Sequence, residues 1–350
     1  MKFGLFDWLD DTGRDLGETY EQRLRMLELA DKLGYYCYHV AEHHATPLSM
    51  LPSPNLFLAA ASQRTGRIRL GVLAYLLPFY QPLRLLEEIA MMDQLSKGRL
   101  EVGLSRGASQ FEMASYSVSA ENSRAMFNEA LDVVLMGLST GKVDYHGKYF
   151  EYDGVETRLR PMQKPYPPLW YPTSNAESIP WLASQGLSAI FALHLAPSVE
   201  TVWSMLERYR TELAAHKDDA ERINGHVSEP LHGFTIHVHV AETDEEAISQ
   251  ARSSWKHFFQ NFAYLWVKHG MGDRYANRSE FDQLLAEGKL LVGSPATVRE
   301  RLKGYIEASG GNYMIGSFSW GNFAPEQVLN SVDLFAREVM PAFAPASSSC

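Results

Sequence analysis

Residues 68–107 read IRLGVLAYLLPFYQPLRLLEEIAMMDQLSKGRLEVGLSRG, and this stretch contains the unit from which the fold follows. The apolar run Ile68–Ala74 predicts a buried strand, and Pro82 predicts the start of a helix that ends at Gly98. A second apolar run, Leu100–Leu104, predicts the next strand. A strand, a helix and a strand in this order predict two parallel strands joined by a right-handed crossover.

The same alternation of strand and helix extends along the chain in both directions. Six further short runs predict strands at Lys2–Phe6, Tyr36–Ala41, Leu169–Tyr171, Ala189–Ala192, His232–Val240 and Tyr313–Ser317. Eight strands separated by helices predict a (β/α)8 TIM barrel of the α/β class. A doubly wound open sheet shares the alternation, but its fingerprint G-x-G-x-x-G does not follow the first strand. The first helix is expected to begin at Thr19, where Gln22 completes a capping box.

Two stretches, residues 142–160 and 267–291, fit no strand–helix unit. The first is polar and rich in aromatic residues, and the second is long and lies late in the chain. We expect both insertions to pack near the C-terminal face of the barrel, where the second forms a mobile lid. No low-complexity linker divides the chain, which predicts one domain over residues 1–350.

Composition and charge exclude several classes of partner. The chain carries 42 acidic and 32 basic residues, a formal net charge of −10, so we expect no nucleic acid and no anionic membrane as partner. The two cysteines, Cys37 and Cys350, predict neither a disulfide framework nor a cysteine zinc site, which suits a cytoplasmic protein. No apolar run is long enough to predict a membrane-spanning helix.

Residues 42–44, Glu-His-His, come directly after a predicted barrel strand. Reactive residues of a TIM barrel lie at this end of the strands, and histidine titrates near neutral pH. Glu42, His43 and His44 are therefore candidates for general acid/base catalysis or hydrogen bonding. The alternative is that one histidine caps the loop while the other packs in the wall.

A second group of candidates predicts an anion site. Arg106 lies just beyond the end of the predicted strand Leu100–Leu104, next to a glycine. Arg124 lies at the start of the next predicted helix. Ser174, Asn175 and Ser178 precede or open a helix, where free N–H groups and side-chain donors bind phosphate. The alternatives are surface ion pairs for the arginines and an ordinary helix cap for the polar loop. Convergence at one barrel mouth favours the phosphate site.

A metal site is the main competing interpretation. His237 and His239 lie two residues apart on a predicted strand and therefore on one face, and His43 and His44 offer further ligands. A metal-dependent barrel hydrolase would be expected to carry a His-x-His pair on its first strand and an acidic ligand late in the barrel. Here the first strand reads FGLFD and the last reads YMIGSFSW, so we expect no metal.

The chain resembles the bacterial luciferase-like flavin monooxygenases, and within them the catalytic more than the non-catalytic luciferase subunit. The matching stretches are MKFGLF, EHH, residues 68–107, AENSRAMFNEAL, SIPWLASQGL, VGSPATV and SVDLFAREVMP, in order over nearly the whole chain. The resemblance implies an FMN-dependent monooxygenase that uses O2 and receives reduced FMN from a separate flavin reductase. It further implies a small organic substrate, of apolar carbonyl type, and a homodimer.

The resemblance also assigns cofactor contacts to individual residues. Arg106 and Arg124 match the family's phosphate-binding arginines, and Asn175 and Ser178 lie in its phosphate loop. Ala74 matches a position beside the flavin ring whose preceding peptide bond is cis. These residues are expected to hold the FMN.

For catalysis, the resemblance assigns the main role to His43, with Glu42 and His44 in support. Where the luciferase catalytic subunit has a reactive cysteine beside the flavin, this chain has Ser105, so light emission is not carried over. The leading alternative is hydride transfer by deazaflavin F420 on the same barrel, since both cofactors carry a phosphate at the same end. A non-catalytic partner subunit is disfavoured because the Glu-His-His motif is present.

Overall fold

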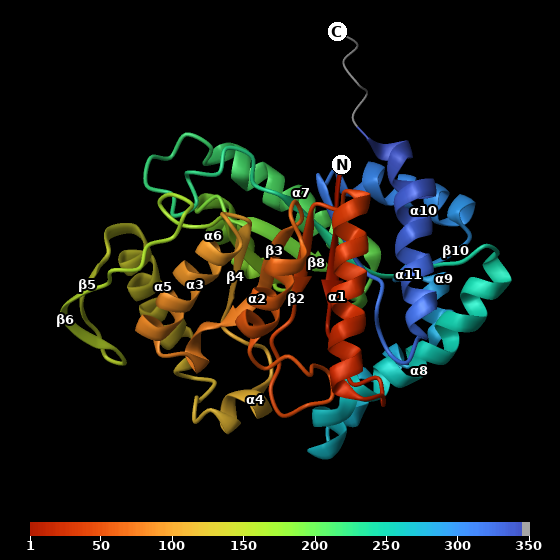
Figure 1. The fold of residues 1–350 in the computed structure, drawn as a ribbon, viewed down its shortest axis with the longest axis horizontal. Helices are drawn as coiled ribbons and strands as arrows, with labels where there is room; N and C mark the ends of the chain where they lie inside the picture. The colour runs from red at the N-terminus through yellow and green to blue at the C-terminus, as the bar shows by residue number, and fades with distance from the viewer. Residues whose placement is uncertain (345–350) are drawn as a thin grey trace, which may run out of the picture.

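The computed structural model describes residues 1–344, apart from the side chains of residues 276 and 277, and contains a closed barrel of parallel strands (Figure 1). Within the described residues, the barrel strands are β1 (Lys2–Asp7), β2 (Cys37–Val40), β3 (Arg69–Leu76), β4 (Leu100–Ser105), β7 (Leu169–Thr173), β8 (Ser188–Ala192), β9 (His232–Val240) and β11 (Tyr313–Ser317). They pair in the order β9-β11-β1-β2-β3-β4-β7-β8, and a pairing of β8 with β9 closes the ring. The predicted TIM barrel is confirmed.

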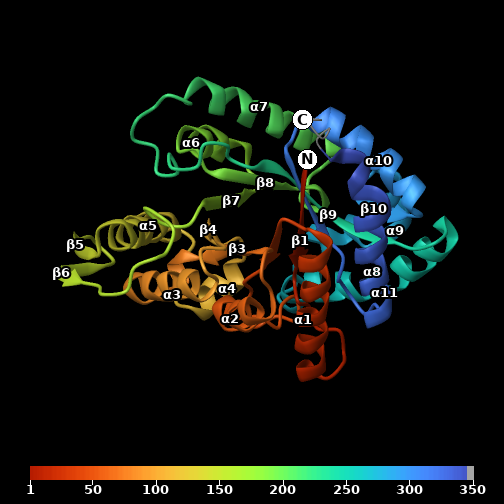
Figure 2. The ribbon, with the colours of Figure 1, turned by 45° about the horizontal axis from the view of Figure 1, so that its top comes forward.

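Helices surround the barrel on its outer side (Figures 1 and 2). The longer helices are α1 (Leu16–Leu33), α2 (Pro54–Arg64), α3 (Pro82–Leu95), α5 (Ser123–Thr140), α7 (Val199–Ala215), α8 (Asp244–Lys268), α10 (Pro295–Ser309) and α11 (Pro325–Leu334). Three short helices are α4 (Gln110–Ser115), α6 (Ile179–Ser184) and α9 (Phe281–Ala286). Across residues 1–344, none of them is long and apolar enough to cross a membrane.

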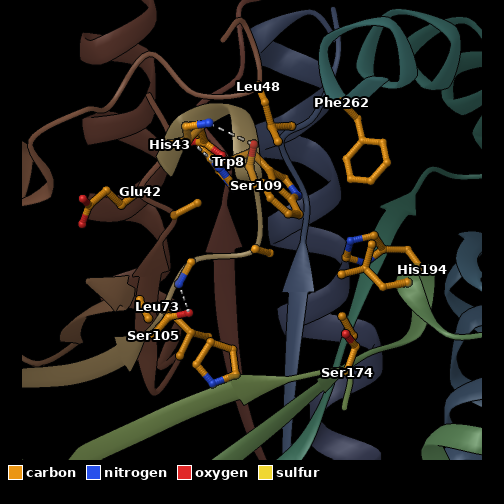
Figure 3. Close-up of a pocket in the computed structure, with 18 of the residues that line it drawn as sticks. Trp8, Glu42, His43, Leu48, Leu73, Ser105, Ser109, Ser174, His194 and Phe262 are labelled. Atoms are coloured by element: carbon orange, nitrogen blue, oxygen red, sulfur yellow. Dashed lines mark hydrogen bonds and ion pairs between the residues drawn. The ribbon is translucent and has the colours of Figure 1, made fainter. Parts of the chain in front are cut away.

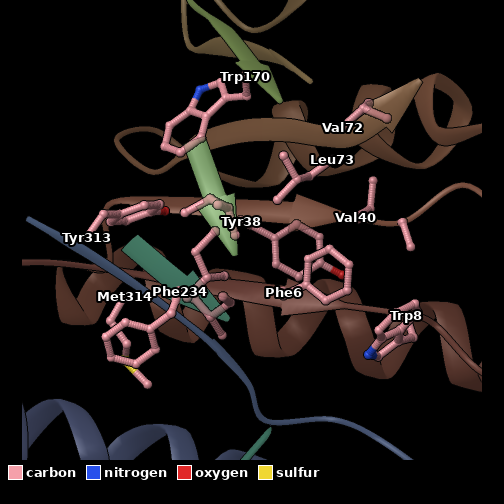
Figure 4. Packing of buried hydrophobic residues seen from close by; sticks show 14 of the residues in the cluster. Phe6, Trp8, Tyr38, Val40, Val72, Leu73, Trp170, Phe234, Tyr313 and Met314 are labelled. Atoms are coloured by element: carbon pink, nitrogen blue, oxygen red, sulfur yellow. The ribbon is translucent and has the colours of Figure 1, made fainter. Parts of the chain in front are cut away.

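Aromatic side chains fill the barrel and the layer between the barrel and its helices (Figure 4). Trp170 and Tyr313 meet inside the barrel, with ring centroids 5.4 Å apart, whereas Tyr38 and Phe234 point outward onto Phe57 of α2 and Trp203 of α7. Trp170, Tyr313, Tyr38 and Phe234 are each at most 1% exposed. Cys37 is likewise buried, as its place in a strand predicts. Because side chains fill the barrel, a ligand must bind beyond this core, at the carboxyl ends of the strands.

The first helix begins earlier than its sequence predicts. α1 starts at Leu16, and the carboxylate of Asp15 accepts a hydrogen bond from the Glu18 N–H (3.0 Å), as an N-cap does. Thr19, the predicted cap, is a buried residue of the first turn whose hydroxyl donates to the Asp15 carbonyl (2.9 Å). The capping-box interpretation of Thr19 is therefore wrong.

The first insertion is an antiparallel hairpin on the flank of the barrel, not at its mouth. Its strands are β5 (Lys142–His146) and β6 (Glu151–Glu156). The Glu129 carboxylate of α5 accepts three backbone N–H groups from the connecting turn, residues 148–150. In Figure 1 the hairpin lies at the left, away from α4. The expected position at the C-terminal face is thus wrong, because the chain enters the hairpin where α5 ends, at the opposite face of the barrel.

The second insertion reaches the mouth as predicted, but part of it is a regular strand. β10 (Leu290–Gly293) pairs in parallel with the second half of β9, from His237 to Val240, whereas the first half of β9 closes the barrel. The short helix η4 (Gly272–Arg278) lies beside the mouth and contributes to its pocket. The single domain expected over 1–350 includes residues 345–350, which lie outside the described residues.

Candidate active site

A pocket of about 560 Å³ opens at the carboxyl ends of the barrel strands. Figure 3 shows Trp8 between His43 on one side and His194 on the other, with Ser105 and Ser174 on a further wall. The volume lies within the usual range for a cofactor or small-ligand site. The pocket therefore lies where the chemistry of a TIM barrel is expected.

His43 lines this pocket and is held by a carboxylate from a distant segment. Its Nδ1 lies 3.1 Å and 3.3 Å from the two carboxylate oxygens of Glu112, in α4. The same carboxylate accepts the His44 backbone N–H at 2.7 Å. The indole of Trp8 stacks on the His43 ring, with centroids 5.8 Å apart and planes at 22°. The ring of His43 is thus fixed on two sides.

The pair of His43 and Glu112 shifts both of their pKa values. Burial lowers the pKa of His43, but the charges and hydrogen bond of Glu112, with Glu42 beyond, outweigh it, so the pKa is raised. Burial raises the pKa of Glu112, but His43 and the His44 N–H outweigh it, so that pKa is lowered. Because an ionised carboxylate accepts but does not donate, Nδ1 of His43 carries a proton. Its Nε2 has no hydrogen-bond partner within residues 1–344.

Glu42 and His44 lie behind His43 and position the loop. Figure 3 shows the Glu42 carboxylate pointing away from the pocket. One of its oxygens lies 2.9 Å from His44 Nε2, and the other accepts the Tyr80 hydroxyl at 2.8 Å. His44 Nδ1 lies 2.7 Å from the hydroxyl of Tyr116, directly after α4. Burial raises the pKa of Glu42. Both side chains therefore have hydrogen-bond partners in neighbouring segments, and of the motif's two histidines His43 lines the pocket and His44 does not.

The two predicted phosphate arginines both lie near Tyr171, and neither is among the residues that line the pocket. Arg106 follows β4 and Arg124 lies in the first turn of α5, and both are close enough to Tyr171 for their charges to lower its pKa against the larger, opposite effect of burial. Neither guanidinium has a hydrogen-bond or ion-pair partner in the part of the chain that the structure describes. Ser105, the residue before Arg106, lines the pocket and accepts the Gly107 N–H at 3.1 Å.

The polar loop after β7 is partly occupied by its own hydrogen bonds. Asn175 caps the short helix η2 (Ala176–Ser178) by accepting the Glu177 N–H at 2.9 Å. The Ser178 hydroxyl donates to the Asn175 carbonyl at 2.7 Å. Ser174 lines the pocket. Asn175 therefore caps η2 with its side-chain oxygen, and the phosphate assignment of Ser174, Asn175 and Ser178 stays a prediction.

The peptide bond between Leu73 and Ala74 is cis, as expected at Ala74. Both residues line the pocket. Leu76, farther along the same strand, pairs in register with Ser105 and donates its N–H to Glu42 at 3.3 Å. β3, β4 and the Glu-His-His motif are thereby joined at one edge of the pocket.

Several pocket residues were not among the sequence candidates. Trp8 and Glu112 contact His43, and Arg274 and Arg278 reach the pocket from η4. His194 follows β8 and lies at the inner wall. A strand-end search finds Trp8 and His194, since both follow strands. Nothing local in the sequence links Glu112 to His43, because 69 residues separate them.

The histidines of the metal interpretation have separate surroundings. The His237 ring lies 4.9 Å from that of His194 and is fully buried, and burial lowers its pKa well below the usual value. His239 stacks on Phe323 and contacts Gln250 through Nε2 at 2.7 Å. Within the described residues, no group of three or more histidine, cysteine or acidic side chains is placed to hold a metal ion.

Comparisons with known proteins place the chain among flavin enzymes. A family model described as luciferase-like monooxygenase matches residues 1–312. The uncharacterized protein y4wF of Sinorhizobium fredii is 32% identical, covering 97% of this chain and 96% of that protein. The oxygenase component of a flavin-dependent trigonelline monooxygenase from Acinetobacter baylyi is 24% identical, covering 98% of this chain and 96% of that protein.

Solved structures share the fold over the whole chain. Monooxygenase RslO1 from Streptomyces bottropensis has 27% identity and a TM-score of 0.84, covering 98% of this chain and 100% of its own. The oxygenating constituent of 3,6-diketocamphane monooxygenase from Pseudomonas putida, in complex with FMN, has 22% identity and a TM-score of 0.81, covering 97% and 98%. A coenzyme F420 dependent reductase from Methanopyrus kandleri has 15% identity and a TM-score of 0.69, covering 98% and 99%. The last two likenesses concern the fold alone.

Proposed function

Since the chain belongs to the luciferase-like monooxygenase family and is an oxidoreductase, we propose that it is the oxygenase component of a two-component, FMN-dependent monooxygenase. The observation that carries a phosphate-bearing flavin cofactor is the pair Arg106 and Arg124, two guanidinium groups near Tyr171 without partners in the described residues. Because F420 carries a phosphate at the same end, the choice of FMN rests on the relatives. The names of the Acinetobacter relative, an oxygenase component, and of the FMN-bound Pseudomonas structure support the proposal. The partners are O2, a separate flavin reductase and a small organic substrate.

The residues present fit an FMN molecule. Arg106, Arg124 and Ser174 would hold its phosphate through charge-assisted hydrogen bonds. The ring would lie against Leu73, Ala74 and Ser105 in the pocket. Bound reduced FMN supplies the electrons with which O2 is activated. The protein's part is to bind, to orient and to exclude water.

His43 is the residue proposed to handle protons. Glu112 fixes its Nδ1, so its Nε2 is the nitrogen free to donate or accept a proton in the pocket. Phe262, Leu265 and Trp266 of α8 give the pocket an apolar wall, which restricts water. Glu42 and His44 keep the loop in place beneath His43.

The decisive experiment is a spectral titration with FMN, riboflavin and F420, followed by oxygen consumption with reduced FMN. We expect FMN to bind best and oxygen to be consumed. Arg106→Ala or Arg124→Ala should weaken FMN binding about 10–100-fold, since each removes a charge-assisted hydrogen bond. Riboflavin binding should change little, because riboflavin has no phosphate. Arg25→Ala, on exposed α1, is the matched control.

Two results would contradict the proposal. If both arginine variants bind FMN as the wild type does, the phosphate lies elsewhere. If F420 binds better than FMN and hydride transfer proceeds without oxygen, the protein is an F420-dependent oxidoreductase.

A homodimer is also proposed. Leu56 on α2 and Met91 on α3 are 76% and 55% exposed, and Leu95 on α3 is 37% exposed. The two helices are linked by a hydrogen bond from Asn55 to Glu88 at 3.1 Å. Exposed apolar side chains on adjacent helices favour a protein–protein contact there. The cytoplasmic location expected from the two cysteines is kept as part of this proposal.

A further inference from the structure

Two arginines of the pocket have no acidic partner in the part of the chain that the structure describes. Arg274 and Arg278 both belong to η4 and both line the pocket. Neither forms an ion pair with any carboxylate of the described residues. The chain as a whole has a net charge of −10, so two unpaired arginines four residues apart make this part of the pocket positively charged against the overall charge of the protein.

The contacts of the two guanidinium groups hold them without cancelling their charge. The Arg278 guanidinium lies 4.7 Å over the Tyr275 ring and donates through Nη2 to the Leu195 carbonyl at 2.8 Å. Its Nη1 is buried and has no hydrogen-bond partner among the described residues. The Arg274 guanidinium lies 4.3 Å over the Trp266 ring. Aromatic faces attract cations but accept no strong hydrogen bond, so donor capacity remains unused.

Trp8 and His194 add further buried hydrogen-bonding groups without partners among the described residues. The Trp8 ring lies 5.8 Å from that of His43 and 5.6 Å from that of His194. The indole N–H of Trp8 and both ring nitrogens of His194 are buried, with no hydrogen-bond partner in residues 1–344. Buried polar groups in proteins are almost always satisfied, and exceptions point to a missing ligand or water.

The charged groups of the pocket come from separate elements, the two arginines from η4 and Glu112 from α4. Burial and the charge of Arg278 lower the pKa of His194 to about 3, so His194 is neutral at ordinary pH. His43 is paired with the ionised Glu112. Among the described residues that line the pocket, Arg274 and Arg278 are cations without a carboxylate partner, so an anion would be attracted to them.

Resting on the function proposed above, we propose that the substrate carries a carboxylate, which binds at Arg274 and Arg278 with the rest of the molecule along Trp8 toward His43. A carboxylate matches the planar fork of a guanidinium group. The aromatic and apolar wall formed by Trp8, Phe262 and Trp266 fits a flat or apolar body. The substrate class is therefore a small organic acid, oxidised at a position remote from its carboxylate.

The test compares benzoate with the uncharged benzamide of the same shape, using calorimetric titration of the FMN-loaded protein. We expect benzoate to bind the wild type at least about tenfold more tightly, as the loss of a charge-assisted hydrogen bond predicts. Arg278→Met and Arg274→Met should each remove this preference. Arg274→Met is the variant expected to fold normally, because the wild-type Arg274 side chain makes no hydrogen bond among the described residues. It therefore keeps the test valid if Arg278→Met misfolds.

The control is Arg252→Met, which removes a nearby positive charge that is paired with Asp282 outside the pocket. It should leave the preference for benzoate intact. FMN affinity, followed separately by flavin fluorescence, should be unchanged in all three variants.

Several outcomes would overturn the assignment. If benzoate binds the wild type no better than benzamide, this end of the pocket is not an anion site. If the preference survives in both pocket variants, the anion binds elsewhere. If Arg278→Met loses FMN affinity instead, the arginines hold the cofactor. Failure of the wild type to bind FMN at all would refute the proposed function and is recognised separately from these results.

Discussion

Replacing Glu112 by Gln isolates the charge that acts on His43. Gln keeps the shape of Glu and retains an oxygen that can accept the His44 N–H, which now donates at 2.7 Å. What is lost is the negative charge 3.1 Å from His43 Nδ1. The Glu112 side chain is 4% exposed and that of His43 is 25% exposed, so solvent screens the pair weakly. The Glu112→Gln variant should therefore fold like the wild type, whereas the pKa of His43 should change.

The size of the effect follows from the kind of contact removed. A hydrogen bond between charged partners contributes about 1.5–3 kcal/mol, and each 1.4 kcal/mol corresponds to tenfold. If the contact persists in the transition state, product formation should fall about 10–100-fold. The pKa of His43 should also fall, because burial lowers it and Glu112 supplies the largest opposing effect. The limb of the pH–rate profile that His43 governs should move to lower pH.

Two measurements check this prediction, and FMN affinity serves as the control. Product formed per O2 consumed is followed across pH, and the His43 ring is titrated by NMR in wild type and Glu112→Gln. FMN binding should not change, since Glu112 is not among the proposed phosphate contacts. An unchanged histidine titration together with unchanged coupling would refute the link between Glu112 and His43.

Three further predictions concern catalysis, stability and assembly. His43→Ala should bind FMN normally but lose about 10²–10⁴ in product formation, with H2O2 released instead; unchanged coupling would leave His43 a packing residue. Burial raises the pKa of Asp10 from 3.8 to about 7, so between these values the folded state binds the extra proton and stability falls as pH rises. Asp10→Asn keeps an oxygen that can accept from Asn261 and Gly321. Its stability relative to the wild type should increase as the pH rises from about 4 to 7, and above pH 7 the gain should reach on the order of 4 kcal/mol. Tm curves of the two proteins that run parallel across this pH range would contradict this. Leu56→Glu should convert a dimer to monomer in sedimentation, and a wild-type monomer would remove the dimer proposal.

The barrel was predictable because its signals are local. Each strand is a short apolar run, and each helix has its own start and stop, so pattern and order suffice to give eight strand–helix units. The same locality placed Glu42–His44, Ser105 and Ser174 at the ends of strands, and their surroundings agree with that placement. The cis bond before Ala74 came from the family resemblance and not from the pattern.

The parts that sequence reasoning missed depend on contacts over long separations or on short elements. α4 has six residues, too few for a visible helical period, yet it carries Glu112. The start of α1 was misplaced because two capping residues, Asp15 and Thr19, compete, and the earlier one forms the cap. β10 has the apolar run LLVG, only four residues long, and its first two residues were assigned to the insertion of residues 267–291.

The hairpin of residues 142–156 was misplaced for a different reason. α5 ends at Gly141, whose backbone is left-handed (φ 78°), and the chain turns there at the amino ends of the strands. A sequence scan sees an irregular polar stretch but not the end of the barrel from which it departs. Glu129, 19 to 21 residues before the turn of the hairpin, accepts its backbone N–H groups and fixes it against α5.

The charged groups of the pocket, taken together, predict how a substrate would be oriented in it. Glu112 holds the protonated nitrogen of His43, and Arg274 and Arg278 have no acidic partner among the described residues. Contacts lead from Arg278 through Leu195 and its neighbour His194 to Trp8 and on to His43. A neutral substrate would gain nothing from this asymmetry, whereas an acid would be turned with its carboxylate away from His43. The group brought to His43 would then be the end opposite the carboxylate.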